Sequence, residues 1–280
     1  MNPMHEKNRQ KWQVTASRWK ARRDVAARWR TCAEDPLFGF EDRQKYLLRK
    51  HIGNLRGKRV CVLGSGDNYA AFGLAQQGAE VTSVDISEAQ LQVAAERADI
   101  LGLNIRFVQG DISDLPSEIK TRVYDFSCSV GVVAIWLSNL KAYYGEAHRI
   151  LKPGGFFMIG ETHPIRQVLH HCEYFHDEKD AEDKIRMEYH YFDHTPKEYL
   201  YNPETGKGYA LVSDVSLEER KGKPTQFNFH WTVSDFVMAL IETEFALVDF
   251  FEKPAAHPEN WRENMLDGLP QGLRILARKR

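Results

Sequence analysis

Residues suited to bind a ligand follow three short apolar segments of the chain. Gly64 and Gly66 come after the first segment, where glycines let the backbone turn tightly and approach a ligand. Asp85 ends the second segment, 19 residues past Gly66, and a carboxylate there can accept both hydroxyls of a ribose. Asp111 follows the third segment and can accept an amino group such as adenine N6. Together these residues indicate a nucleotide-like ligand.

The chain around these residues alternates between strand and helix patterns. Strands are expected over the ranges 59–63, 80–84, 104–108, 122–128, 156–159, 246–252 and 272–278. Helices are expected over 68–77, 87–101, 138–151 and 233–243. Strands separated by helices of this length imply right-handed βαβ units, which place helices on both faces of a parallel sheet. The fold class is therefore α/β, with a doubly wound, mostly parallel sheet of seven strands. Its ligand site is expected beyond the carboxyl ends of the strands.

Two stretches do not fit this alternation. Residues 1–55 indicate a helical arm or lid, and residues 162–232 indicate an inserted, β-rich cap with expected strands near 186–192, 208–213 and 226–231. A long interruption of this kind is more often functional than idle. The expected domains are therefore the arm at 1–55, a core at 56–161, the cap or substrate region at 162–232 and a completion of the core sheet at 233–280.

Five strings occur in a characteristic order along the chain. They are VCVLGSGDN from Val60, VTSVDIS from Val81, FVQGDISDL from Phe107, YDFSCSVGVV from Tyr124 and RILKPGG from Arg149. The set resembles the class I S-adenosylmethionine-dependent methyltransferases of the small-molecule type over about residues 57–161, and residues 228–280 also fit. The resemblance implies a Rossmann-like fold, S-adenosyl-L-methionine as cofactor and S-adenosylhomocysteine as product.

The resemblance also implies roles for the residues at the strand ends. Gly64, Ser65 and Gly66 would contact the methionine moiety of the cofactor. Asp85 would bind ribose, and Asp111 with Ile112 would hold adenine. Ser129 and Val130, after the fourth strand, are expected to floor the pocket with backbone groups. The predicted cofactor-binding residues are Gly64, Ser65, Gly66, Asp67, Asn68, Asp85, Ile86, Asp111, Ile112, Ser129 and Val130.

Two residues depart from the family pattern. Val62 stands where the family usually has an acidic residue, and Asn68 stands where it usually has a third glycine. Asp67 and Asn68 could supply the missing polar contacts. A dinucleotide-binding site is an alternative, because its fingerprint also places an acid about 20 residues after the glycines. Its third glycine would fall on Tyr69, which argues against NAD(P).

The candidates for catalysis follow the fifth strand and precede the helix at 233. Methyl transfer from a sulfonium is an in-line displacement, so the protein must align the acceptor, exclude water and, for some acceptors, remove a proton. His163 is a candidate general base, Glu161 could orient it or bind a cationic acceptor, and His230 is a second candidate. Alternatively, His163 caps the strand and bonds to backbone.

Tryptophans and histidines outside the strand ends supply further candidates. Trp136, Trp231 and Trp19 are predicted to line the substrate pocket, and Trp12 with Trp19 to cover the cofactor from the arm. Six histidines fall within residues 163–194, together with Cys172, but His170-His171-Cys172 followed by His176 matches no trusted zinc spacing. No metal site is expected.

The net charge of −1 conceals an uneven distribution. Residues 1–60 hold 16 Lys and Arg against 6 Asp and Glu, so the remaining 220 residues carry the compensating negative charge. The leading hypothesis is an enzyme that methylates O, N or C of a small molecule. A nucleic-acid or protein methyltransferase that uses the basic arm and a non-catalytic cofactor-binding scaffold are the alternatives. With no long apolar run, no signal segment and four scattered cysteines, a cytoplasmic protein without a membrane span is expected. The methyl acceptor and the oligomeric state are left open.

Overall fold

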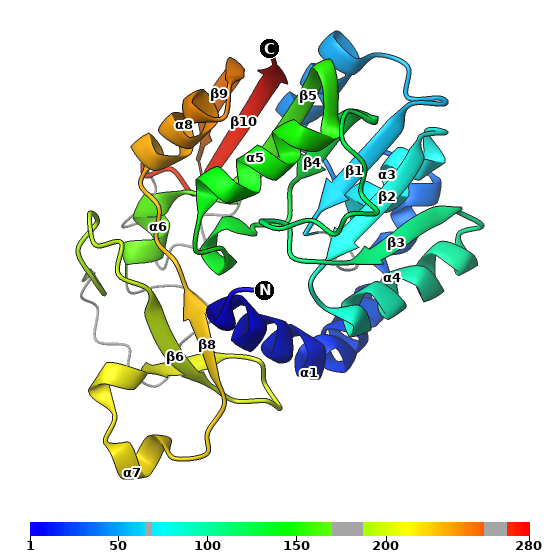
Figure 1. Cartoon of the computed structure of the whole chain (residues 1–280). Coiled ribbons are helices and arrows are strands. Elements are labelled where there is room, and N and C mark those ends of the chain that lie inside the picture. The colour runs from blue at the N-terminus through cyan, green and yellow to red at the C-terminus, as the bar shows by residue number, and fades with distance from the viewer. Residues whose placement is uncertain (65–68, 170–186, 255–267) are drawn as a thin grey trace.

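A seven-stranded sheet with helices on both faces forms the body of the protein (Figure 1). The computed structural model describes residues 1–64, 69–169, 187–254 and 268–280. The strands of this sheet are β1 (Arg59–Leu63), β2 (Glu80–Asp85), β3 (Ile105–Gln109), β4 (Tyr124–Ser129), β5 (Leu151–Thr162), β9 (Phe245–Lys253) and β10 (Gly272–Lys279).

The order of the strands places the reversal of the sheet between β1 and β4. Neighbours run β3-β2-β1-β4-β5-β10-β9, and β10 pairs antiparallel with both β5 and β9 while the other pairs are parallel. Connections leave β1 and β4 in opposite directions, which opens a crevice at their carboxyl ends. This architecture confirms the predicted fold class.

Side chains of β1 alternate between the two faces of the sheet. Val60 and Val62 pack on one face, where Phe72 is buried, and Cys61 and Leu63 pack on the other, where Tyr143 is buried. The helices that follow β1, β2 and β4 are α3 (Tyr69–Gln76), α4 (Glu88–Ile100) and α5 (Leu140–Ile150), and α8 (Val233–Glu242) precedes β9. Cys61 and Cys128 are buried core residues, and burial raises the pKa of both thiols. Cys172 lies outside the described residues.

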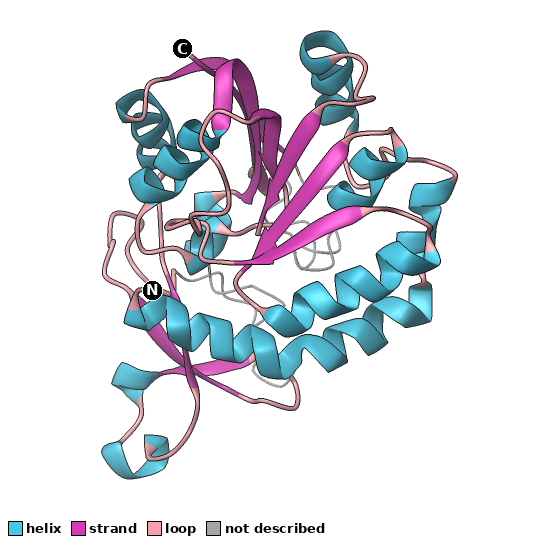
Figure 2. Cartoon of the chain, turned by 45° about the vertical axis from the view of Figure 1, so that its right-hand side comes forward, coloured by secondary structure: helices cyan, strands magenta, loops and turns pink. Residues whose placement is uncertain are grey.

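The N-terminal stretch divides into a helix that leaves the body and segments that belong to it. Helix α1 (Pro3–Ala26) lies alongside α4, as Figure 2 shows. The shorter helices that follow are η1 (Arg28–Ala33), α2 (Asp42–Leu47) and η2 (Leu48–Ile52). Trp29, Cys32 and Leu47 are buried in the same hydrophobic cluster as Val60. Residues 28–52 therefore help to build the core, and α1 is the part of the expected arm that crosses the strand ends.

The expected cap contains a separate three-stranded antiparallel sheet. Its strands are β6 (Lys197–Tyr201), β7 (Gly208–Leu211) and β8 (Thr225–Asn228), in the order β7-β6-β8. The short helices of the region are α6 (Pro164–Val168), η4 (Val212–Asp214) and α7 (Leu217–Arg220). The strand predicted near 186–192 is wrong for residues 187–192. Only Met187 there forms an isolated bridge, and a turn follows in which Asp193 N–H donates to the His190 carbonyl. His230 Nε2 forms a hydrogen bond with the Tyr191 carbonyl, and the Val233 amide donates to the Tyr191 hydroxyl. This segment is therefore held by contacts with side chains rather than by pairing with another strand.

Helix α1 lies between the two sheets and joins them. The Asn8 side chain donates from Nδ2 to the Phe227 carbonyl at 2.9 Å and accepts the Phe227 amide at Oδ1 at 2.8 Å. One amide side chain therefore makes the pair of hydrogen bonds that a neighbouring strand would offer to β8. Lys7 and Glu198 add an ion pair with an Nζ–Oε1 distance of 2.6 Å.

Two glycines in helices offer a test of how closely the N-terminal segment is packed. A Cβ at Gly73 in α3 would lie 1.8 Å from the Pro36 carbonyl oxygen, whereas a Cβ at Gly145 in α5 would meet nothing within 4 Å. Gly73→Ala is expected to lower the free energy of unfolding by about 1–3 kcal/mol through overpacking. Gly145→Ala should instead raise it by about 0.5–1 kcal/mol, because alanine loses less backbone entropy in a helix. Urea unfolding of both variants measures the difference, and equal effects would contradict the close packing of residue 36 on α3.

Candidate functional site

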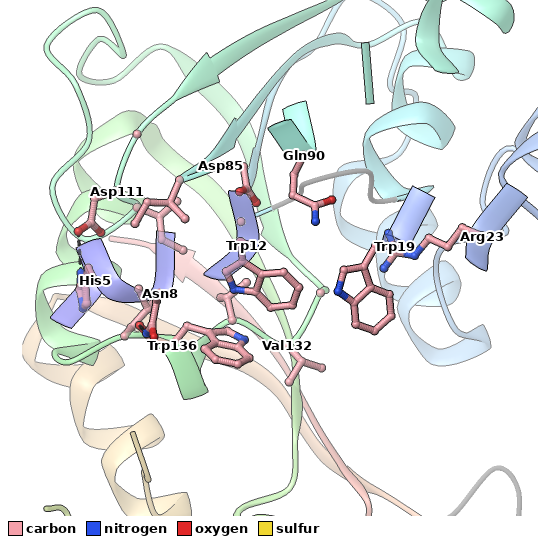
Figure 3. Close-up of a pocket in the computed structure, with 17 residues that line it drawn as sticks. His5, Asn8, Trp12, Trp19, Arg23, Asp85, Gln90, Asp111, Val132 and Trp136 are labelled. Carbon is pink, nitrogen blue, oxygen red and sulfur yellow. Dashed lines mark hydrogen bonds and ion pairs between the residues drawn. The ribbon is translucent and has the colours of Figure 1, made fainter. Parts of the chain in front are cut away.

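A pocket lies at the carboxyl ends of the strands and is covered by α1 (Figure 3). Its floor comes from the loops after β1, β2, β3 and β4. Its lining residues are His5, Asn8, Trp12, Trp19, Arg23, Gly64, Asp85, Ile86, Gln90, Gly110, Asp111, Ile112, Gly131, Val132, Val133, Trp136 and Leu137. Five of the predicted cofactor-binding residues therefore share one cavity, namely Gly64, Asp85, Ile86, Asp111 and Ile112.

Gly64 occupies the end of β1 in a conformation that glycine adopts readily. Its φ is +65°, and its amide donates to the Val84 carbonyl at 2.8 Å. A Cβ at this position would lie 2.4 Å from Cγ1 of Val133. The missing side chain therefore lets the loop after β4 pack directly against the end of β1. Ser65, Gly66, Asp67 and Asn68 lie outside the described residues.

Asp85 projects into the pocket at the end of β2. Its Oδ1 accepts the Ser87 amide at 2.9 Å, and Ser87 in turn caps the start of α4. The carboxylate of Asp85 lines the cavity, and a carboxylate can accept hydrogen bonds from hydroxyl groups of a ligand. Gln13 of α1 accepts from Ser87 and from the Ala89 amide, which ties the covering helix to the same turn.

Asp111 is buried at the end of β3 and bonds to the N-terminal helix. Its Oδ2 lies 2.6 Å from Nδ1 of His5, and its Oδ1 accepts from the amide and the hydroxyl of Ser113. Burial opposes ionisation, but the hydrogen bonds from His5 and Ser113 outweigh it and hold the pKa of Asp111 below its usual value. Oδ2 keeps one acceptor position, so Asp111 can still receive an amino group.

His5 connects two strand ends through its two ring nitrogens. Nδ1 donates to Asp111, while Nε2 accepts the Ser138 amide at 2.9 Å. A neutral imidazole with its proton on Nδ1 satisfies both partners. The role of this residue could not be identified from the sequence, because it depends on a contact between side chains 106 positions apart.

Three tryptophans contribute to the pocket, and two of them hold a buried lysine. The rings of Trp12 and Trp136 meet edge to face at 5.2 Å, and Lys11 Nζ lies 3.9 Å and 4.1 Å from their centroids. Lys11 is 4% exposed, and burial lowers its pKa to about 7. Of the three tryptophans predicted to line the substrate pocket, Trp136 and Trp19 line this cavity. Trp231 lies outside the lining and donates from Nε1 to the Ala134 carbonyl.

The predicted catalytic histidines lie outside the pocket lining. His163 accepts the Ile165 amide at Nδ1, which caps α6, and its Nε2 lies 2.7 Å from Oε1 of Glu252. His230 lies between Oε1 of Gln167 and the Tyr191 carbonyl. Burial lowers the pKa of both imidazoles, to about 4 for His230. Both rings therefore bond to neighbouring segments of the chain. For His163 the bond to a backbone amide agrees with the alternative interpretation, but the residue caps α6 rather than the strand.

Glu161 is buried behind the pocket rather than in it. Its Oε1 accepts the amides of Val133 and Ala134, both at 3.1 Å. Burial raises its pKa to about 8, although these two hydrogen bonds and the charge of Arg274 act in the opposite direction.

The backbone floor of the pocket begins two residues later than predicted, at Gly131 rather than Ser129. Ser129 is buried and Val130 packs in the core, and neither lines the cavity. Gly131, Val132 and Val133 line it instead. Gly131 is the sequence signal, since a glycine directly after a strand allows close approach of backbone to a ligand.

No group of three His, Cys, Asp or Glu side chains with the geometry of a metal site occurs among the described residues. His190 and His194 bond to neighbouring protein groups, Phe192 N and Asp235 respectively. His170, His171, Cys172 and His176 lie outside the described residues. Within the same ranges, no helix combines the length and the hydropathy needed to span a bilayer.

Comparison with known proteins identifies similar sequences. A family model for the methyltransferase domain matches residues 54–214. Over 156 residues the chain is 28% identical to a ubiquinone biosynthesis O-methyltransferase of Alkalilimnicola ehrlichii, covering 54% of this chain and 58% of that protein. It is 31% identical over 121 residues to a demethylmenaquinone methyltransferase of Tropheryma whipplei, covering 42% and 48%. The chain thus spans about half the length of the curated relatives that it matches.

Solved structures resemble the chain over most of its length. An S-adenosylmethionine-dependent methyltransferase from Mesorhizobium loti has a TM-score of 0.58 at 23% identity, covering 84% of this chain and 96% of that one. One from Clostridium acetobutylicum has a TM-score of 0.56 at 16% identity, covering 84% and 89%. At these identities the likeness establishes the fold.

The buried Lys11 gives a prediction about stability and pH. Because its folded pKa lies near 7 and a free lysine titrates near 10.5, the unfolded chain takes up the proton more readily between these values. The full cost of burial is therefore present below pH 7 and fades as the pH rises toward 10.5. Lys11→Met is expected to raise the free energy of unfolding at pH 7 by roughly 1–3 kcal/mol, and the gain should shrink at pH 9.5.

Urea unfolding of Lys11→Met at the two pH values measures the change in stability. Lys7→Met is the matched control, because Lys7 lies on the same helix but is 45% exposed. If Lys11→Met raises the free energy of unfolding equally at pH 7 and pH 9.5, the lowered pKa of Lys11 is contradicted.

Proposed function

The chain belongs to the methyltransferase-domain family, the class I S-adenosylmethionine-dependent methyltransferases of the Rossmann-like fold, and on this premise we propose that it methylates O, N or C of a small molecule. The observation that carries the proposal is the placement of Gly64, Asp85 and Asp111 at three strand ends around one covered pocket. A glycine for close approach, an acid for hydroxyl groups and an acid for an amino group match the three parts of S-adenosylmethionine in that order.

The pocket residues fit this cofactor in named ways. Asp85 lines the pocket at the end of β2, where its carboxylate can accept the ribose hydroxyls, and Asp111 retains one acceptor position beside His5 for the adenine amino group. Ile86 and Ile112 line the pocket and can supply apolar contact for the base, and Gly64 lines it at the end of β1, where backbone without a side chain can approach the methionine moiety closely. When bound, the sulfonium supplies an activated methyl group, so the protein needs no nucleophile of its own.

The chain's own contribution to the reaction is positioning and the exclusion of water. Helix α1 closes the pocket with Trp12, Trp19 and Asn8, and the loop at 131–133 closes it from below (Figure 3). Holding both reactants in line supplies most of the rate acceleration that such a displacement requires. We propose that catalysis depends mainly on this enclosure of the reactants and not on proton transfer by His163 or His230. Both imidazole rings are already hydrogen-bonded to other segments of the chain.

A small-molecule acceptor is supported by the relatives and by the charges of the N-terminal helix. One relative reported above is named as an O-methyltransferase of ubiquinone biosynthesis, and the other as a demethylmenaquinone methyltransferase. Basic side chains of α1 are engaged by the protein itself, as in the pairs Lys7–Glu198 and Lys20–Glu96. A polyanionic partner would have to compete with these contacts.

Calorimetric titration with S-adenosylmethionine and S-adenosylhomocysteine tests the proposal. Both should bind the wild-type chain, and Asp85→Asn should raise the Kd by about tenfold or more, because hydrogen bonds to a charged acceptor are lost. Asp99→Asn, an exposed change on α4, is the control and should leave the Kd unchanged. Absence of binding to the wild type sinks the methyltransferase proposal, and binding of NAD(P) instead would favour a dehydrogenase.

Closure of the pocket by α1 predicts a change in binding kinetics. Trp12→Leu removes aromatic surface from the wall of the pocket and should accelerate S-adenosylhomocysteine dissociation by about fivefold or more, since roughly 1 kcal/mol of apolar contact is lost. Val25→Ala changes a side chain that is 90% exposed on the same helix and should have no effect. Stopped-flow measurement of the dissociation rate distinguishes them, and equal rates would show that α1 does not cover the bound ligand.

A further inference from the structure

The loop after β4 holds a valine in a conformation that β-branched residues avoid. Val132 has a φ of +59°. Four non-glycine residues of the described chain have positive φ, and Val132 is the one among them that lines the pocket. A branched Cβ in the left-handed region clashes with the backbone, so such a residue persists only where its surroundings enforce it.

The end of β5 enforces this conformation through three successive amides. Val132 N–H donates to the Gly160 carbonyl at 3.4 Å, and the next two amides, of Val133 and Ala134, both donate to Oε1 of Glu161. The turn is thereby fixed from behind, while Val132 and Val133 face the pocket. Val133 in turn packs against Gly64, so the loop sets the width of the pocket at the end of β1.

Glu161 occupies a position that is unfavourable for a carboxyl group. It is 1% exposed, and its Oε2 has no hydrogen-bond partner within the described ranges. Arg274 donates to the backbone carbonyl of Glu161, and its guanidinium pairs with Glu41. A buried acid with one oxygen unsatisfied costs stability, and an apolar residue of the same shape would avoid that cost. Retention of the acid is explained if its Oε1 is needed to hold the loop.

We propose that Glu161 is a positioning residue that holds the Val132 turn in the shape required to bind the cofactor. This inference rests on the proposed function. Glu161 acts through the amides of Val133 and Ala134 and does not itself touch the ligand. The sequence-based expectation that Glu161 orients His163 or binds a cationic acceptor is replaced by this role, because its Oε1 points to the loop after β4.

Variants of Glu161 and Val132 separate this role from general support of the fold. Glu161→Leu keeps the side-chain volume and loses the acceptor, whereas Glu161→Gln keeps an acceptor oxygen in the same place. Val132→Gly removes the steric cost of positive φ, so the turn needs less support. The Glu161→Leu/Val132→Gly double variant should therefore recover what Glu161→Leu alone loses.

Two readouts apply to all variants of the full chain, with thermal unfolding to verify folding. Calorimetry gives the Kd for S-adenosylhomocysteine, and hydrogen exchange of the ligand-free protein reports the amides of Val133 and Ala134. Glu161→Leu should raise the Kd and the exchange rate by about tenfold or more, and Glu161→Gln by less than about threefold. Val132→Gly is the reference for the double variant, in which adding Glu161→Leu should change both quantities by less than about threefold.

Each result decides the matter. A folded Glu161→Leu variant with unchanged affinity and exchange overturns the inference. Glycine at 132 that gives no recovery also overturns it, because Glu161 would then support the fold as a whole. If Glu161→Leu alone fails to fold, folding of the double variant supports the inference and its failure to fold refutes it. Absence of binding to the wild type counts against the proposed function, while the exchange of Val133 and Ala134 still judges whether Glu161 holds the turn.

Discussion

The closed form of the pocket depends on one buried hydrogen bond, from His5 in the N-terminal helix to Asp111 at the end of β3. The two side chains are 2% and 5% exposed, so neither can exchange its partner for water while the helix is docked. The second ring nitrogen of His5 accepts the Ser138 amide, which extends the connection to the loop after η3 (Ala134–Trp136). Separation of α1 from the body would expose all three groups at once. Docking of the helix and formation of the pocket wall are therefore one event.

The uneven charge of the sequence has a structural explanation in this docking. Lys7 of α1 pairs with Glu198 of the cap sheet, and Lys20 of α1 pairs with Glu96 of α4. In a third pair the helix supplies the acid, because Asp24 of α1 pairs with Arg97 of α4. Exposed ion pairs contribute little individually to stability. Distributed along both flanks of one helix, they favour a single orientation of α1 between the two sheets. The basic arm is thus complementary to the acidic body.

The strand ends could be predicted from sequence because their signals are local. Gly64, Asp85 and Asp111 follow apolar runs of strand length, and parallel strands bring such positions to one edge. The contributions of His5, Asn8 and Lys11 could not be predicted, since each depends on a partner more than 100 residues away. The strand expected near 186–192 failed for a related reason. Alternating aromatic residues fit a half-buried strand, but here they pack around His230 and α8 instead. The roles of His163 and Glu161 are decided by where β5 ends relative to its neighbours, which no spacing in the sequence records.

Buried ionisable side chains have different kinds of partner in the described structure. Arg97 is 2% exposed but lies 3.0 Å from Oδ1 of Asp24, so its burial is compensated by an opposite charge. Lys11 and Glu161 are equally buried, yet neither forms an ion pair within the described residues. Aromatic faces surround the first, and backbone amides contact the second. Val132, whose backbone is in the left-handed region, lines the pocket itself. Strained backbone and buried ionisable groups lower the free energy of unfolding, and in proteins such features are common at functional sites. Val132 lines the pocket, Lys11 packs on two of its tryptophans, and Glu161 holds its loop at 131–133, so the neighbourhood of this cavity supports its assignment as the functional site independently of any sequence motif.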